Sequence, residues 1–236
     1  MSGLAHVGLY RRGAAAALVV APTLFLLDNL LHPKEYARGN EAKQVAEIAE
    51  HYTRWQLAHA IGFVAIVVFA AAVLGLAFLV RRRQPAVGLV AGALALAGLM
   101  GLAAAITIDG FSWGVIGVAS LDSRVGPAPS ASMLDVMQHS RWALLYYVAP
   151  VGFIVGLAAL ALAAARQGAV PLWAGGLLAL AALLTGTETV ITSNAYFIVG
   201  AAVLLAGGAA VAYYLARQSD AEFAGESGAG RPEPGA

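Results

Sequence analysis

The chain has 236 residues, of which 60% are apolar and 11% are charged. Soluble domains carry about 25% charged residues, so this composition excludes a soluble enzyme and a disordered chain and favours an integral membrane protein. The net charge of +1 leaves no basic surface for nucleic acid, and the absence of cysteine excludes disulfides, thiolate metal sites and a cysteine nucleophile.

Six apolar runs are long enough to cross a bilayer, which takes about 20 residues per helix. They cover residues 13–31, 55–80, 85–108, 142–165, 171–191 and 196–215. We therefore expect an all-α integral membrane protein with six transmembrane helices in residues 1–218. Residues 219–236 are rich in Gly, Pro and Glu, and this composition predicts a disordered cytoplasmic tail.

Arginine in short loops indicates which side of the membrane each loop occupies. Seven arginines lie at the ends of the spans or in the short loops on one side: Arg11, Arg12, Arg81, Arg82, Arg83, Arg166 and Arg217. The triplet 81–83 lies in a very short loop and decides the orientation. It predicts a multi-pass protein of the inner (cytoplasmic) membrane with both termini in the cytoplasm and three loops outside.

Two of the outer loops contain sequences typical of short helices. Asn40 is a candidate N-cap for a helix with Val45 and Ile48 on its apolar side. Ser132 and Asp135 have the spacing of a capping box at the start of a second helix. We expect both helices to lie in the membrane interface and to lead into the next span.

Spans one, three and five each carry an acid near the outer end, and these acids recur roughly every 80 residues. They are Asp28, Asp109 and Glu188. The spacing predicts three helical hairpins that place equivalent groups at equivalent depth. With His59 of span two, these acids are the ionisable residues within the spans, and all four lie in the outer half. Because such residues face a bundle interior or a watery cavity, we expect a polar cavity above a dry inner half.

Glu188 is the deepest of these residues, six positions before the turn at Asn194. At that depth the protonated form of a carboxyl is favoured, which is the condition for a proton donor. The neighbouring threonines, at positions 185, 187, 189 and 192, are expected to hydrogen-bond this carboxyl. A purely structural, threonine-bonded glutamic acid is the alternative interpretation.

The other two acids have weaker signals. Asp28 precedes His32 by four residues, so the two side chains can share a helix face and a hydrogen bond. Asp109 precedes an apolar, Gly-rich segment at 110–120. This segment fits a re-entrant or broken helix lining a cavity, or alternatively a helix that continues outside the bilayer.

Aromatic residues and histidines follow the outer ends of the spans. Those expected to line the cavity and contact a substrate are Trp55, His59, Trp113, Trp142 and Tyr146. For Trp55 and Trp142 the alternative is a role as interface anchors. His59 and His139 are the alternative ligands for a b-type haem or a divalent metal.

The motif Leu31-His32-Pro33 after span one, and a short helix leading into Arg54-Trp55-x-Leu57, resemble six-helix integral membrane proteins of GC-rich bacteria. The resemblance lies in topology and composition along the chain, and it implies the fold without an activity. A more remote similarity is to small membrane terpene cyclases, which also combine few spans, intramembrane carboxylates and aromatic residues. Their span count differs, and none of their motifs matches residue by residue.

The leading hypothesis is an outer-leaflet cavity that binds an amphiphilic or isoprenoid-like molecule from the membrane lipid, without a cofactor. Glu188 and Asp109 are then the proton donor or base, and Asp28 is a charge partner. Two alternatives remain open: a haem or metal carrier, and a transport or assembly subunit in which the acids pair structurally. The sequence indicates no oligomeric state.

Overall fold

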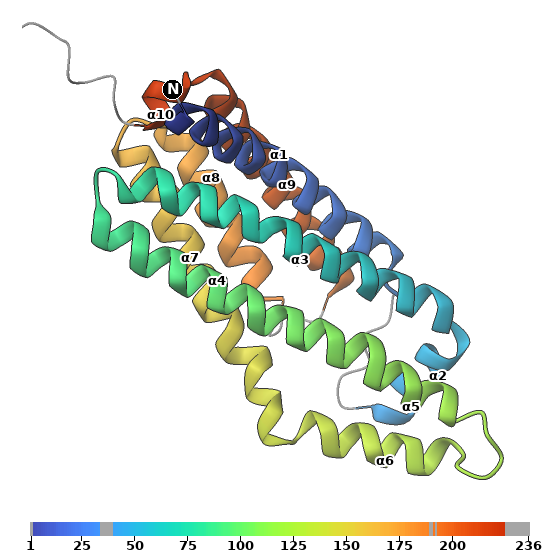
Figure 1. Ribbon diagram of the computed structural model, residues 1–236. Coiled ribbons are helices and arrows are strands. Elements are labelled where there is room, and N and C mark those ends of the chain that lie inside the picture. The colour runs from blue at the N-terminus through green and yellow to red at the C-terminus, as the bar shows by residue number, and fades with distance from the viewer. Residues whose placement is uncertain (1, 34–39, 189–190, 192, 225–236) are drawn as a thin grey trace, which may run out of the picture.

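Each apolar run of the sequence contains a helix in the computed structural model (Figure 1). The structure describes residues 2–33, 40–188, 191 and 193–224, and within them every regular element is helical. The longer helices are α1 (Ser2–Leu31), α3 (Tyr52–Arg81), α4 (Pro85–Thr107), α7 (Leu145–Arg166), α8 (Leu172–Gly186) and α9 (Asn194–Arg217). The shorter ones are α2 (Glu41–Glu50), the π-helix η1 (Ile108–Trp113), α5 (Gly114–Ala119), α6 (Pro127–Gln138), the 3₁₀-helix η2 (Arg141–Leu144) and α10 (Asp220–Ala224).

Five helical stretches among the described residues are long and apolar enough to cross a membrane. They are His6–Leu31, Tyr52–Arg81, Pro85–Ala119, Tyr147–Arg166 and Asn194–Arg217. The expectation of an all-α membrane protein is thus confirmed. Helix α8 has 15 residues, about 22 Å of rise against a hydrocarbon core of about 30 Å, so the sixth span stays a prediction.

The six longer helices form a closed ring in chain order. Each packs on the next, from α1 through α3, α4, α7 and α8 to α9, and α9 packs on α1. A continuous core of buried Ala, Leu, Val and Phe side chains fills most of the ring. The division into three hairpins stays a prediction, because each expected pair also packs on its neighbours.

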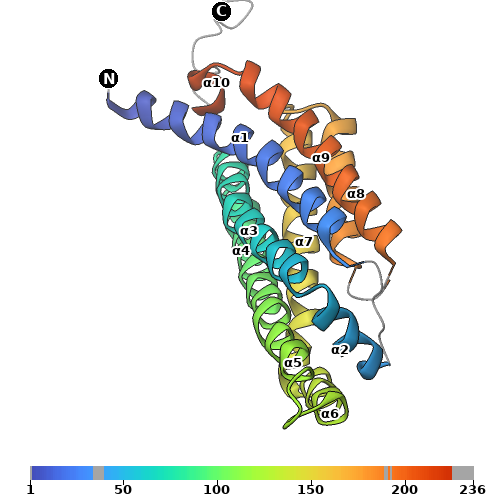
Figure 2. The ribbon, with the colours of Figure 1, turned by 90° about the vertical axis from the view of Figure 1, so that its right-hand side faces the viewer.

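One end of the bundle carries α10, which lies beside the N-terminal part of α1 (Figure 2). Arg11 of α1 joins the two: its Nε donates to Asp220 Oδ1 at 2.9 Å, and its Nη1 donates to the carbonyls of Leu215 and Ala216. Phe223 of α10 is fully buried. The prediction of disorder from residue 219 is therefore wrong for Asp220–Ala224, because this helix buries a side chain and forms an ion pair.

The opposite end of the bundle carries α2, α5 and α6, as Figures 1 and 2 show. Helix α4 continues through η1 and α5 to Ala119, a stretch of 35 residues or about 52 Å. That exceeds the hydrocarbon core by about 20 Å. The segment after Asp109 continues the helix and does not turn back as a re-entrant segment would. Its position outside the bilayer stays a prediction.

Both helices expected in the outer loops are present, and they pack on each other and on α5. Their shared core contains Val45, Ile48, Trp55, Trp113, Ile116 and Leu134. Asn40 caps α2 as expected, because its side chain accepts a hydrogen bond from the backbone N–H of Lys43 at 3.0 Å. The capping-box prediction at Ser132 is wrong: α6 begins five residues earlier, at Pro127, after Gly126 with a φ of 75°. Proline at the first helical position fits such a start.

Candidate functional site

A cavity of about 170 Å³ lies between the helices, toward the end that carries α2, α5 and α6. Residues from α1, α3, α4, α7, α8 and α9 all contribute to its wall. Its polar lining consists of Asp28, Asn29, His32, His59, Asp109, Thr185 and Glu188. Phe25, Phe153 and Phe197 are part of the apolar wall.

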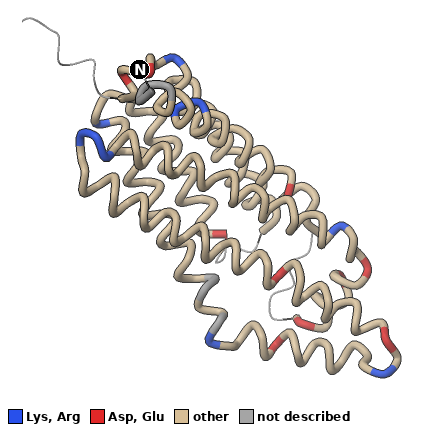
Figure 3. Tube along the Cα trace, viewed as in Figure 1, with Lys and Arg blue, Asp and Glu red and all other residues tan. Residues whose placement is uncertain are grey.

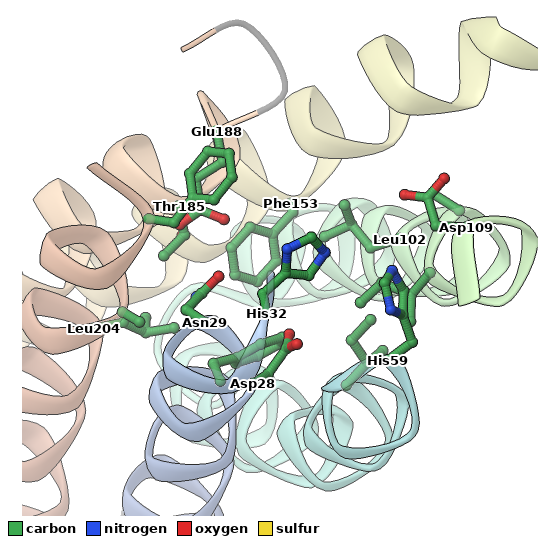
Figure 4. Close-up of a pocket in the computed structure, with 16 residues that line it drawn as sticks. Asp28, Asn29, His32, His59, Leu102, Asp109, Phe153, Thr185, Glu188 and Leu204 are labelled. Carbon is green, nitrogen blue, oxygen red and sulfur yellow. The ribbon is translucent and has the colours of Figure 1, made fainter. Parts of the chain in front are cut away.

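The four ionisable residues that the sequence analysis located within the spans all line this cavity. Figure 3 shows acidic positions interrupting the otherwise uncharged tube part-way along the bundle, while most Lys and Arg gather at its ends. In Figure 4, Asp28 and His32 point between the helices from one side, and Glu188 and Thr185 lie across from them. The expected convergence is confirmed; the chemical roles assigned to these residues stay predictions.

Glu188 follows the C-terminal end of α8, and its carboxyl rests against the backbone of α9. A Cβ added at Gly200 would lie 2.9 Å from Glu188 Oε1, so a larger residue there would displace the carboxyl. Oε1 is buried and has no hydrogen-bond partner among the described residues. A buried acceptor without a partner is costly, so this oxygen is a candidate contact for a ligand.

The hydroxyls of Thr185 and Thr187 have other partners, and that of Thr187 also bonds to the Tyr196 hydroxyl of α9 at 2.6 Å. Thr185 Oγ1 donates to the carbonyl of Ala181 and Thr187 Oγ1 to that of Leu183, each at 2.8 Å. The expectation that these two hydroxyls hold the carboxyl is therefore wrong, because back-bonding to the i−4 carbonyl uses their protons. Residues 189 and 192 lie outside the described part of the chain.

Asp28 is seated in the same manner as Glu188. A Cβ at Gly62 of α3 would come within 2.6 Å of Asp28 Oδ2, so the carboxyl lies directly on the backbone of α3. No hydrogen bond joins this carboxyl to another described residue. One turn later, His32 places its Nδ1 3.2 Å from the carbonyl oxygen of Pro33. Both carboxyls therefore occupy space that a glycine on the neighbouring helix provides.

The imidazole rings of His32 and His59 pack against the indole ring of Trp55. The ring centroids of His59 and Trp55 lie 4.4 Å apart, and those of His32 and Trp55 lie 4.9 Å apart. Trp55 is 3% exposed and its Nε1 donates to the carbonyl of Asp109 at 3.0 Å. Trp113 stacks behind Trp55 with centroids 6.4 Å apart. The two indoles thus support the imidazoles and η1 from behind the cavity wall, and neither lines the cavity as the sequence analysis expected.

His139 lies outside the cavity. Its side chain is 74% exposed, whereas His59 is buried, and its Nδ1 lies 3.0 Å from Asp135 Oδ1. The hydrogen bond to the backbone carbonyl of Asp135 and the nearby carboxylate raise the pKa of His139. The structure therefore does not bring together the two histidines proposed as alternative haem or metal ligands. The side chains of Trp142 and Tyr146, both expected at the cavity, are outside those that the structure describes.

Three polar lining residues were not among the predicted site residues: Asn29, His32 and Thr185. His32 follows Asp28 by one helical turn, and this spacing is the signal that points to it. Asn29 and Thr185 stand beside acids in the sequence, but polarity alone does not show which way a side chain points.

Comparison of the chain with protein-family models, with curated proteins and with solved structures found no match. The function is therefore inferred from the geometry of this cavity.

Proposed function

We propose that the protein is a six-span inner-membrane protein with both termini in the cytoplasm and a cavity facing the outer leaflet. The cavity binds the polar end of an amphiphilic or isoprenoid-like molecule. An apolar wall with a few convergent polar groups is the usual make-up of a small-molecule site. A volume of about 170 Å³ suits one small group, since a cavity of about 150 Å³ can hold a benzene ring. The rest of such a ligand would extend into the bilayer.

The proposal includes acid/base chemistry at Glu188, which gives or takes a proton at Oε1. The observation that carries it is that this oxygen is buried at the cavity without a hydrogen-bond partner among the described residues. Asp28 lines the same cavity as a charge partner, and Asp109 is the second candidate acid. A positioned carboxyl of this kind contributes roughly 10²–10⁴-fold to a rate.

The test is to extract the detergent-purified protein with organic solvent and to identify the bound molecules by mass spectrometry. We expect an amphiphile in near-stoichiometric amount, together with its product. Ala201→Leu on α9 narrows the cavity and should remove both molecules. Glu188→Gln should retain part of the amphiphile and lack the product. Identical extracts from the native protein and Ala201→Leu would contradict binding, and an unchanged product level in Glu188→Gln would contradict the chemistry.

A further inference from the structure

We infer that the polar end of the ligand is a primary ammonium group, as in an alkylamine or an amine-bearing lipid. This inference concerns the same cavity and rests on the function proposed above. It adds the chemical class of the ligand, and it follows from which hydrogen-bonding capacities the cavity wall leaves open. Three features carry it: the carboxyls, the tautomer of His59 and the absence of a basic side chain from the described lining.

The two carboxyls supply acceptors and negative charge. Glu188 Oε1 is buried and has no partner among the described residues. The carboxyl of Asp28, which lines the same cavity, makes no hydrogen bond to another described residue. An ionised carboxyl accepts hydrogen bonds only. A buried carboxylate costs several kcal/mol when no counter-charge is near, and a bound cation supplies that counter-charge.

The imidazole of His59 also presents an acceptor. Its Nδ1 lies 2.8 Å from the carbonyl oxygen of Trp55. A carbonyl oxygen only accepts, so in the neutral ring the proton is assigned to Nδ1 and Nε2 is left as an acceptor. Thr185 has already used its hydroxyl proton on Ala181. Among these polar groups only the amide of Asn29 offers donors to a ligand.

The described lining contains no Lys or Arg. Arg54, at the outer end of α3, is engaged elsewhere: its guanidinium donates to the carbonyls of Leu30, Leu31 and His32 at the end of α1. Arg54 thus occupies the C-terminal end of α1, whereas the C-terminal end of α8, at Gly186, adjoins the lining residue Glu188. A helix C-terminus carries partial negative charge, which favours a bound cation. A ligand group with one positive charge and three N–H donors therefore complements this wall.

A series of six-carbon ligands tests the inference on the unaltered protein. We would measure the melting temperature in non-ionic detergent, at constant ionic strength, with hexylamine, hexyltrimethylammonium, hexanol and hexanoate. Hexylamine should raise it most, by about 5 °C at a concentration near 100 times its dissociation constant. The quaternary ion has charge without N–H donors, and the alcohol has a donor without charge, so both should give less than half that rise. Hexanoate should give none.

The source of the amine is distinguished by a lipid pair. Lysophosphatidylethanolamine carries the primary ammonium, and lysophosphatidylcholine carries its quaternary counterpart. If lysophosphatidylethanolamine raises the melting temperature and lysophosphatidylcholine does not, the site binds a lipid headgroup. A rise with hexylamine and with neither lipid assigns it to a free amine. Either outcome supports the inference.

Variants locate the effect. Asp28→Asn and Glu188→Gln should each remove at least half of the hexylamine rise. The matched control is Asp122→Asn in the exposed loop after α5, which should leave it unchanged, because Asp122 pairs there with Arg124. Equal rises with hexylamine and hexanol that Ala201→Leu abolishes would overturn the ammonium inference while leaving the cavity as a binding site. If hexylamine raises the melting temperature of Ala201→Leu as much as that of the native protein, both the inference and the proposed binding site are overturned. If sodium chloride gives the same rise as hexylamine, the inference alone is overturned.

Discussion

The two ends of the helix ring treat their polar groups in opposite ways. At the arginine-rich end, Arg83 donates to the carbonyl of Gln167, and the Gln167 amide donates to that of Val80. Arg11 holds the end of α9 in a similar way, although the side-chain oxygen of Gln218 has no partner among the described residues. At the cavity end, the carboxyls of Glu188 and Asp28 lie against glycines, without such partners among the described residues. Paired groups stabilise the bundle, whereas unpaired buried groups cost stability and indicate a binding site.

The largest expected effect separates chemistry from stability at the cavity end. Glu188→Gln keeps the side-chain volume but cannot exchange a proton. Turnover of the bound amphiphile should fall by about 100-fold or more, while the melting temperature changes by only a few degrees. Mass-spectrometric product formation and thermal unfolding in detergent measure the two quantities. If full turnover remains, Glu188 is not the proton donor and Asp109 is the next residue to change.

The arginine-rich end should respond in the opposite sense. Arg11→Met removes the donors for Asp220 and for the carbonyls of Leu215 and Ala216, and leaves these acceptors buried or half-buried. We expect a loss of about 2 kcal/mol, or roughly 4–8 °C in melting temperature. Arg12→Met is the matched control, since Arg12 is exposed and should tolerate the change. Equal losses in the two variants would show that charge at this end matters more than the contacts.

This contrast also shows what the sequence could predict. The helices follow from the length of the apolar runs, and the convergence of Asp28, Asp109 and Glu188 follows from their similar depth in successive spans. The ion pair of Arg11 with Asp220 joins residues 209 positions apart, so no local pattern indicates it. The composition of residues 219–236 predicted a disordered tail, because composition does not reveal a contact with a residue as distant in the sequence as Arg11.

The candidate site was predictable in position but not in its bonding. The threonine-rich segment suggested a network around Glu188, yet the hydroxyls of Thr185 and Thr187 donate to carbonyls of α8, and Thr187 also bonds to Tyr196. Backbone carbonyls compete for hydroxyl protons in every helix, and the sequence does not show which acceptor wins. Trp55 was expected to line the cavity because it shares a helix face with His59. That spacing does not show which of the two rings borders the cavity and which lies behind it.

A smaller effect tests whether glycine seats the carboxyl. In Gly200→Ala the new Cβ meets Glu188 Oε1, so the carboxyl must move. Turnover should fall by about 10-fold, since even a displacement near 1 Å impairs a positioned group. Stability should hold, because alanine favours a helix by about 1 kcal/mol. Gly176→Ala on α8, where nothing lies within 4 Å, is the control that should leave turnover unchanged.

The cost of the unpaired oxygen can be measured by removing it. Glu188→Met keeps a similar volume and has no oxygen to desolvate, so it should raise the free energy of unfolding by about 1 kcal/mol. Had the threonines bonded the carboxyl, the same change would strand their hydroxyls and lower stability. The sign of the shift in melting temperature therefore distinguishes an unpaired from a paired carboxyl at this position. A loss would place a bonding partner beside Oε1.

The smallest effect lies at the exposed pair His139 and Asp135, at the end of α6. Here the folded-state pKa of the histidine is above its usual 6.5, because the imidazole bonds to the carbonyl of Asp135 and faces its carboxylate. A raised histidine pKa adds stability below the unfolded value, and this contribution disappears as the pH rises through the folded value. Native protein should therefore melt at most about 1 °C above Asp135→Asn near pH 5.5 and equal it near pH 8.5. High salt should reduce the difference at pH 5.5, since both groups face solvent. A difference that is the same at both pH values would come from the altered helix, not from the charge of His139.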